Sequence, residues 1–387
     1  MLGEKMTTFT DESRFWVVFD TCTASHYYPD LHKLLATPPG SIIRYEYRAK
    51  WLSDEVAKAL EKKGDLPARV LLAYAQGRTY LRGQPAPKED ESGNFEDLLL
   101  VPTRIARLVN VVRDGTEFYF DLRLEAYPAL QETQIFRELF ARHEAPYWKW
   151  VAFSSRTGDL EALEAGVDDE KWRSLVETLF IPPSQFAGDI FWRLNGIKES
   201  GQADYLTPAD HYEVGGNGLA QVTSVYSLVE DRVYSTELTT LRSPAPRAGG
   251  QHHKVEIVAK SGDDKVVQLV GSGRFDVRQY TSTHMELEAR HLEALMRRKL
   301  EISLETEPPD GDWPQGPRLV LKVVVGKNWT KVWLGAVAGF GGLMLGASAV
   351  SEFFKGQAGI LPVTAGAGSV LLIAIGLTVL TGKPQLK

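Results

Sequence analysis

Apolar and polar residues alternate along several segments before residue 130, and a period of two residues is typical of a half-buried strand. In residues 41–51, Ile43 and Tyr45 fall on one face, while Arg44 and Arg48 fall on the other. The segment therefore predicts a strand with an apolar side and a basic side.

Further elements before residue 130 follow from the same pattern. A short helix is predicted at 53–64, where Ser53 is placed as the N-cap residue. Arg113-Asp114-Gly115 is typical of a hairpin turn. The strands expected around these two features are 70–74, 98–112 and 116–126.

The pattern changes to helical spacing between residues 131 and 203. Trp172, Leu175, Val176 and Leu179 fit one helix face, and a further short helix is predicted at 185–194. After residue 204 the period returns to two. The strands expected there are 220–229, 232–241, 254–259, 265–270, 300–305 and 318–325. The stripe Met285, Ala289, Leu292 and Met296 predicts one helix among them.

These patterns together predict an α+β protein. The expected parts are a mixed, barrel-like α/β domain at 1–130, a helical segment at 131–203 and a sandwich-like β-rich domain at 204–326 with one helix. The last part, 327–387, is expected to be a two-helix transmembrane hairpin.

The hairpin prediction rests on two apolar runs at 332–350 and 361–380. Each run is about as long as the ~20 residues that a helix needs to cross a bilayer. No Asp, Glu, Lys, Arg or His interrupts either run. The sequence therefore predicts two membrane-spanning helices.

Lysines flank the two runs unevenly. Lys322, Lys327 and Lys331 precede the first run, and Lys383 and Lys387 follow the second. Positive residues favour the cytoplasmic side of a membrane. The expected location is thus the cell inner membrane, with both the body and the C-terminal tail in the cytoplasm.

Small residues are frequent in both runs. They are Gly335, Gly339, Gly342 and Gly346 in the first run, and Gly366 and Ser369 in the second. Small residues allow close approach of helix backbones. Either the two helices pack on each other, or hairpins from several chains assemble, and the pattern leaves both open.

The chain carries a net charge of −6. The acidic excess lies before Leu319, because the residues from there onward contain six lysines and a single glutamate. A body of this charge repels a phosphate backbone, so generic binding to nucleic acid is disfavoured.

Arginines offer the best candidates for binding an anion. Arg44 and Arg48 share a strand face, and Arg156 lies in a Ser/Thr/Gly-containing loop. A small anionic ligand at these residues is therefore one hypothesis, and a cytoplasmic protein partner is another.

The sequence indicates no catalytic centre, metal site or cofactor. The adjacent pair His252 and His253 has no HxxxH or HExxH context, and no GxSxG nucleophile motif is present. We therefore expect a non-enzymatic protein that needs no cofactor.

The organisation, a cytoplasmic body followed by two membrane helices, resembles that of membrane effectors of bacterial abortive-infection and antiphage systems. That resemblance implies an oligomerising effector that perturbs the inner membrane when its body binds a ligand or partner. The alternatives are a passive membrane-tethered adaptor or scaffold and, third, a membrane-tethered enzyme.

Overall fold

The computed structural model describes residues 11–21, 28–62, 66–77, 98–128, 151–153, 169–179, 190–216, 218–242, 255–277, 280–292, 297–307, 318–354 and 369–373. Most of these residues belong to strands in three sheets. The predicted α+β class is therefore wrong, because the described chain is mainly β. The expected domain boundaries stay predictions.

The first sheet has the strand order β2-β5-β4-β3-β1-β6. Strands β1 and β3 are parallel, and the other neighbours are antiparallel. Its strands are β1 (Asp11–Thr21), β2 (Ile42–Arg48), β3 (Pro67–Gly77), β4 (Leu98–Asp114), β5 (Glu117–Leu124) and β6 (Val151–Phe153).

Helix α2 (Asp54–Lys62) covers one face of the first sheet. Ser53 caps it as predicted, because the Val56 N–H donates to Ser53 Oγ at 3.3 Å. Val56 is fully buried against the sheet residues Tyr45 and Phe120. Between β2 and the helix lies one turn of 3-10 helix, η2 (Ala49–Trp51). The predicted hairpin is confirmed by Gly115, which joins β4 to β5 with a φ of 57°.

The second and third sheets form a sandwich around one core. The second sheet has the order β12-β14-β10-β7, and the third has the order β13-β11-β15-β16-β9-β8. In the third sheet β16 and β9 are parallel. The strands are β7 (Ile190–Glu199), β8 (Ala209–Val214), β9 (Ala220–Val229), β10 (Arg232–Arg242), β11 (Glu256–Ser261), β12 (Val267–Val270), β13 (Arg274–Asp276), β14 (Tyr280–Ala289), β15 (Arg298–Glu307) and β16 (Arg318–Gly326).

The core of the sandwich follows the period-two pattern of its strands. On β16, Leu319, Leu321, Val323 and Val325 are buried in this core. On β10, Leu238 is buried in the same core and faces them from the other sheet. The predicted sandwich-like packing of this region is thus present in the described residues.

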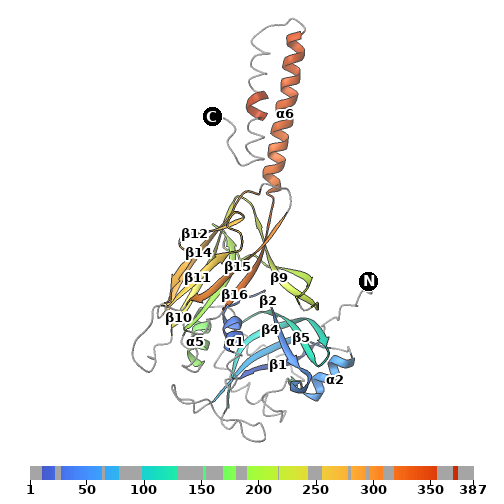
Figure 1. Ribbon diagram of the computed structural model, residues 1–387, viewed down its shortest axis with the longest axis vertical. Helices are drawn as coiled ribbons and strands as arrows, with labels where there is room; N and C mark the ends of the chain where they lie inside the picture. The colour runs from blue at the N-terminus through green and yellow to red at the C-terminus, as the bar shows by residue number, and fades with distance from the viewer. Residues whose placement is uncertain are drawn as a thin grey trace.

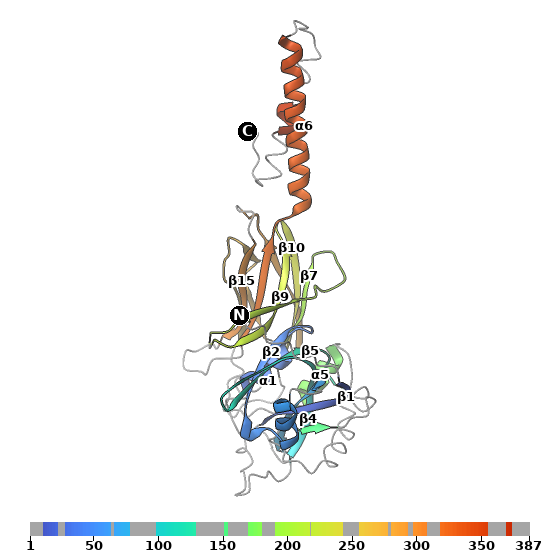
Figure 2. The ribbon, with the colours of Figure 1, turned by 90° about the vertical axis from the view of Figure 1, so that its right-hand side faces the viewer.

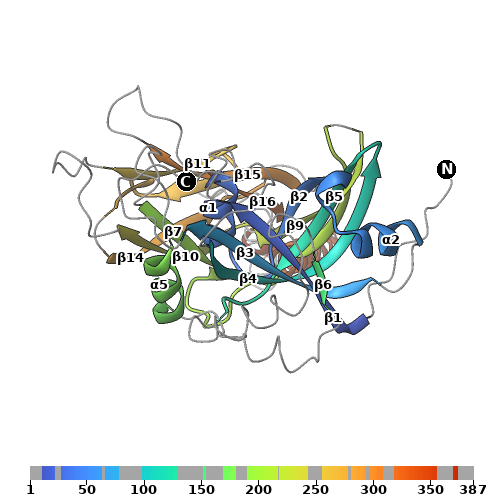
Figure 3. The ribbon, with the colours of Figure 1, turned by 90° about the horizontal axis from the view of Figure 1, so that it is seen from below.

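The three parts follow one another along the long axis of the molecule, as Figures 1 and 2 show. The first sheet lies at one end, the sandwich lies in the middle, and α6 (Trp329–Phe354) projects from the other end. Helix α1 (Tyr28–Ala36) lies between the first sheet and the sandwich (Figure 1). It contacts β4, β7 and β16, and the view from below shows it beside β7 and β16 (Figure 3). Near it, α5 (Asp169–Thr178) contributes Trp172 to a core shared with Tyr127 and Phe191.

The predicted helical middle is contradicted by the structure. The segment expected as a helix at 185–194 contains the first half of β7, and residues 185–189 lie outside the described ranges. Both faces of β7 are buried, so Phe191, Trp192, Arg193 and Leu194 show no alternation that would reveal a strand. Of the expected helical faces, Trp172 and Leu175 do lie on a helix, α5.

The helix expected around Met285 and Ala289 is also wrong. These residues belong to β14, which pairs with β10 and β12. Met285, Leu287 and Ala289 are buried while the residues between them are exposed. Met285 and Ala289 are four residues apart, which fits a helix, but with Leu287 they also fit the two-residue period of a strand. Hydrogen bonding to β10 on one side and β12 on the other stabilises the strand.

The predicted transmembrane hairpin is contradicted as well. Among the described residues, no helix combines the length and the apolarity required to cross a membrane. The expected multi-pass location in the inner membrane is wrong for the same reason, whereas the expected lipid partner stays a prediction. Of the second run, the structure describes only the helical residues 369–373.

Two physical reasons explain the error. The membrane-span prediction relied on the absence of charged residues from 332–350. This run also contains five glycines, which lower its apolarity because they add no apolar side-chain surface. The prediction also attributed the flanking lysines to membrane topology. Instead, Lys322, Lys327 and Lys331 form ion pairs with carboxylates of the sandwich.

Candidate functional site

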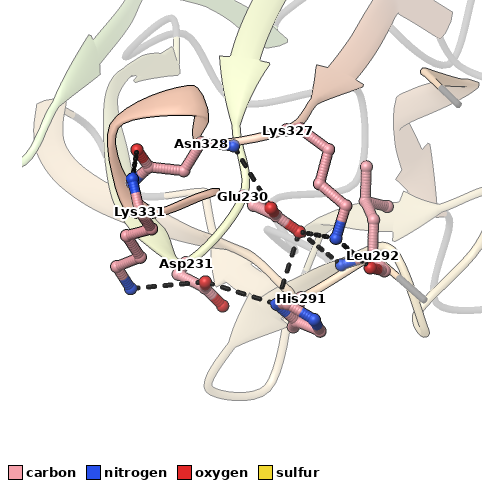
Figure 4. Close-up of polar contacts among 7 residues, drawn as sticks. All are labelled: Glu230, Asp231, His291, Leu292, Lys327, Asn328 and Lys331. Atoms are coloured by element: carbon pink, nitrogen blue, oxygen red, sulfur yellow. Dashed lines mark hydrogen bonds and ion pairs between the residues drawn. The ribbon is translucent and has the colours of Figure 1, made fainter. Parts of the chain in front are cut away.

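The junction between α6 and the sandwich gathers several charged side chains. Glu230 and Asp231 form the turn between β9 and β10, His291 follows β14, Lys327 follows β16, and Lys331 lies in the first turn of α6. Figure 4 shows these side chains converging. We call this group, together with Asn328, the helix-anchoring cluster.

Glu230 is the centre of the helix-anchoring cluster and is only 2% exposed. Its carboxylate accepts backbone hydrogen bonds from Leu292 at 2.7 Å and from Asn328 at 3.2 Å. Lys327 Nζ lies 3.1 Å from Glu230 Oε2, and both side chains are almost fully buried. A buried carboxylate with this many donors is fully compensated and fixes the elements that supply them.

Lys327 itself spans the junction. Its Nζ also donates to the backbone carbonyl of Leu292. The Asn328 side chain accepts from the Lys331 N–H at 3.3 Å and so caps the first turn of α6. The first turn of α6 is thereby tied to the sandwich by both backbone and side-chain contacts.

Asp231 adds a second, more exposed contact to the helix. It has a φ of 58°, which Asp tolerates better than most residues, and its carboxylate lies 3.3 Å from Lys331 Nζ. His291 Nδ1 lies 3.4 Å from carboxylate oxygens of both Glu230 and Asp231.

Glu230, Asp231 and His291 are residue types that can ligate a metal, and their donor atoms lie within 4.8 Å of one another among the described residues. Lys327 and Lys331 already neutralise the two carboxylates, however, and a divalent cation would have to displace both ammonium groups. The arrangement therefore favours an anchor for α6 over a metal centre.

A further ion pair lies in the third sheet, beside the β9 residues that face the first sheet. Glu213 on β8 pairs with Lys322 on β16 and accepts from Gln221 at 2.7 Å. Burial pushes the pKa of Glu213 upward, but the hydrogen bonds from Lys322 and Gln221 outweigh it, so the pKa lies below its ordinary value of 4.5.

Beyond this anchor, α6 exposes a row of large apolar side chains. Trp333, Val337, Phe340 and Met344 are each at least 60% exposed. Their spacing of four, three and four residues places them on one face of the helix. We call these four residues the α6 seam.

The small residues expected to pack helices together lie on the face opposite the α6 seam. A Cβ atom at Gly342 would lie 2.7 Å from the carbonyl oxygen of Ser369, so these two residues are in close contact. Gly335 is buried, whereas a Cβ at Gly339 would meet open space. Gly346 lies on the same helix, and Gly366 lies outside the described residues.

The arginines expected to bind an anion have different environments. Arg44 forms two hydrogen bonds to Asp121, at 2.7 and 2.9 Å, which neutralise its charge. The Arg48 side chain is 63% exposed and lies 3.8 Å from Glu117. Arg156 is outside the described residues. Of the two described arginines, Arg48 is the more accessible, and an anionic ligand at these residues stays a prediction.

Sequence reasoning missed Glu230 as a functional residue. Its partners Leu292, Lys327 and Asn328 are between 62 and 98 positions away, so no local motif could reveal them. The available signal was the acidic pair in a predicted strand-to-strand turn, together with lysines just before an apolar helix.

Comparison with known proteins adds no functional assignment. No protein-family model and no curated protein matches the chain.

Proposed function

We propose that this is a recognition and assembly protein in which α6 joins copies of the chain to one another. The α6 seam carries the proposal, because four large apolar side chains of one helix face remain at least 60% exposed. Burying each side chain of this size is worth about 1.5–3 kcal/mol. An uncovered row of this kind is a surface for another protein.

The chemistry of the α6 seam favours a second copy as the occupant. Its spacing is that of the a and d positions of a coiled coil, where identical helices interlock. No charged side chain lies between Val332 and Val350, so two copies would not repel each other there. A charged partner would find nothing on this face with which to pair.

The helix-anchoring cluster supports the same function. Because Glu230 and Lys327 fix the base of α6, the helix points away from the sandwich and presents the seam at a distance from the sheets (Figure 1). Helices joined through the seam would hold several bodies together, each free to recognise its own ligand or partner.

The test is the mass of the full chain in aqueous buffer, measured by light scattering and by sedimentation over a range of concentrations. We expect an oligomer, and the double variant Val337→Glu with Phe340→Glu should weaken it by at least about tenfold in dissociation constant. Leu334→Glu is the matched control, because Leu334 is 61% exposed but lies outside the α6 seam.

Two outcomes would overturn the proposal. One is a monomer at every concentration reached. The other is a protein that binds phosphatidylcholine and phosphatidylglycerol vesicles as a monomer and loses this binding in the double variant. The second result would assign the seam to lipid and not to another copy of the chain.

A further inference from the structure

A pocket of about 480 Å³ lies where the first sheet meets the sandwich. Three segments and one strand residue form its walls. They are the loop after α1 (Pro39, Gly40), the β7 residues Asn195 and Gly196, the loop from Tyr205 to Pro208, and Tyr226 on β9. Pockets of roughly 300–1,000 Å³ at junctions between structural units are the usual sites of small ligands.

One wall of the pocket depends on the backbone conformation of Gly196 and on its close contact with Tyr205. The pairing of β7 with β10 shifts opposite Glu237, and Gly196 at this shift has a φ of 134°. A Cβ at Gly196 would lie 3.0 Å from the ring of Tyr205, so this ring rests directly on the glycine. The Leu206 N–H donates to the Ile197 carbonyl at 2.7 Å and fixes the loop against β7.

The opposite wall is equally defined. Gly40 has a φ of 82°, and its N–H donates to the Leu124 carbonyl at 2.8 Å. Tyr226 is 1% exposed, and its hydroxyl shares a hydrogen bond with Ser41 at 3.2 Å. The pocket is therefore preformed and does not depend on movement of either wall.

The chemistry of the lining is aromatic and uncharged. Two tyrosines and two prolines line the pocket, and none of its nine described lining residues carries a charged side chain. Burial raises the pKa of Tyr205, so its phenol stays protonated at neutral pH. An anion would find no cationic side chain in this lining.

Asn195 belongs to the fixed wall of the pocket. Its Nδ2 donates to Glu237 Oε2 at 2.8 Å, and a carboxylate can only accept, so the orientation of the amide is fixed. The Asn195 side chain also interacts with the Tyr205 side chain, which lines the pocket beside it. The Tyr205 ring is therefore positioned from two sides, by Gly196 beneath it and by Asn195.

We propose that this pocket binds a small, uncharged, planar ring compound. The ring would stack on Tyr205 and pack between Pro39 and Pro208. Offset stacking on an aromatic side chain favours flat ligands over saturated rings of the same size. This site is separate from the α6 seam.

The experiment compares three probes by saturation-transfer NMR on the full chain. Indole is planar and uncharged, benzoate is planar but anionic, and cyclohexanol is uncharged but not planar. We expect saturation of indole, with affinities for benzoate and cyclohexanol weaker by at least about tenfold.

A filled pocket provides the decisive control. Thr207 is exposed and lines the pocket, so Thr207→Trp should occupy it without disturbing the core. Thr116→Trp adds the same side chain at the distant, exposed hairpin of the first sheet. The proposal requires indole binding in the wild type and in Thr116→Trp and its loss in Thr207→Trp. Unchanged binding in Thr207→Trp, equal binding of all three probes, or no binding of indole would each overturn it.

Discussion

Asp121 and Glu230 are both nearly fully buried, and each carboxylate accepts hydrogen bonds from more than one element. Asp121 on β5 receives Arg44 from β2, Asn110 from β4 at 2.8 Å and the Val222 N–H from β9 at 2.9 Å. Asp121 thus connects the first sheet to the sandwich, as Glu230 connects the sandwich to α6.

Glu230→Gln should lower the free energy of unfolding by about 3 kcal/mol, because it leaves the buried Lys327 ammonium without its counter-charge. Denaturant unfolding measures this loss. Adding Lys327→Met to Glu230→Gln should recover part of the stability, since the unpaired charge is then removed. Asp231→Asn is the control. Asparagine tolerates the positive φ at this position, and the substitution removes only an exposed ion pair worth about 0–1 kcal/mol. An equal loss in Glu230→Gln and Asp231→Asn would contradict the assignment.

Glu237 predicts a dependence of stability on acid pH. The Ser282 hydroxyl, together with Asn195, holds the pKa of Glu237 below its ordinary value of 4.5 despite partial burial. The folded state therefore binds fewer protons than the unfolded state when the pH falls below about 4.5. The stabilisation is complete above that pH and is lost as the pH falls through the folded-state pKa.

The variant Glu237→Gln isolates this contribution. Its melting temperature should fall less than that of the wild type between pH 6 and pH 3.5, as followed by circular dichroism. Glu286→Gln is the matched control on the neighbouring strand, at an exposed position. Identical acid dependence in the wild type and Glu237→Gln would refute the role of this carboxylate.

At the scale of elements, the sequence revealed the strands that have one buried face. The alternation at 41–51 predicted β2, and Ile43 and Tyr45 are buried as expected. It could not reveal β7, whose two faces both meet cores, or β14, whose residues also fit a helical stripe. In both cases pairing with β10, which is distant in sequence, determined the structure.

The α6 helix was correctly expected as a helix, but its surroundings were not. Its apolar run was assigned to a membrane because it contains no charged residue. The lysines beside it were assigned to the cytoplasmic side of that membrane. The ion pairs of Lys327 and Lys331 depend on a turn about 100 residues earlier, which no local pattern indicates. The helix-anchoring cluster could therefore not be predicted from the sequence, although β9, β10, β16 and α6, which contribute to it, were predicted.

The two glycines Gly339 and Gly342 should respond differently to substitution. Gly342→Ala places a methyl group 2.7–2.9 Å from backbone atoms at Ser369 and Ile373, so α6 must shift away from them. Gly339→Ala meets open space and should stabilise the helix by up to ~1 kcal/mol. Amide hydrogen exchange along α6 should accelerate in the first variant and slow in the second. The same change in hydrogen exchange in both variants would show that Gly342 does not pack on residues 369–373.

At the scale of the whole molecule, the first sheet, the sandwich and α6 stand in series (Figure 2). Units joined end to end move relative to one another by default unless their interfaces are tied. Here the junction of the first sheet and the sandwich holds the Asp121 contacts, a double hydrogen bond from Arg123 to Asp210 at 2.5 Å, and the Ile42 N–H to Ser224 bond at 3.1 Å. The seam of α6 therefore has a fixed orientation relative to the pocket.

Loosening that junction should separate the unfolding of the two units. Asp121→Asn combined with Arg123→Met removes the two charged β5 side chains that bind the sandwich, while it leaves the two cores intact. We expect differential scanning calorimetry to resolve two transitions in this variant and one in the wild type, and small-angle X-ray scattering to report a broader range of dimensions for the variant. Arg48→Met with Glu117→Gln is the control, because this exposed pair lies within the first sheet and does not reach the sandwich. A single transition and unchanged scattering in the junction variant would mean that apolar contacts around α1, and not the carboxylate network, hold the two units together.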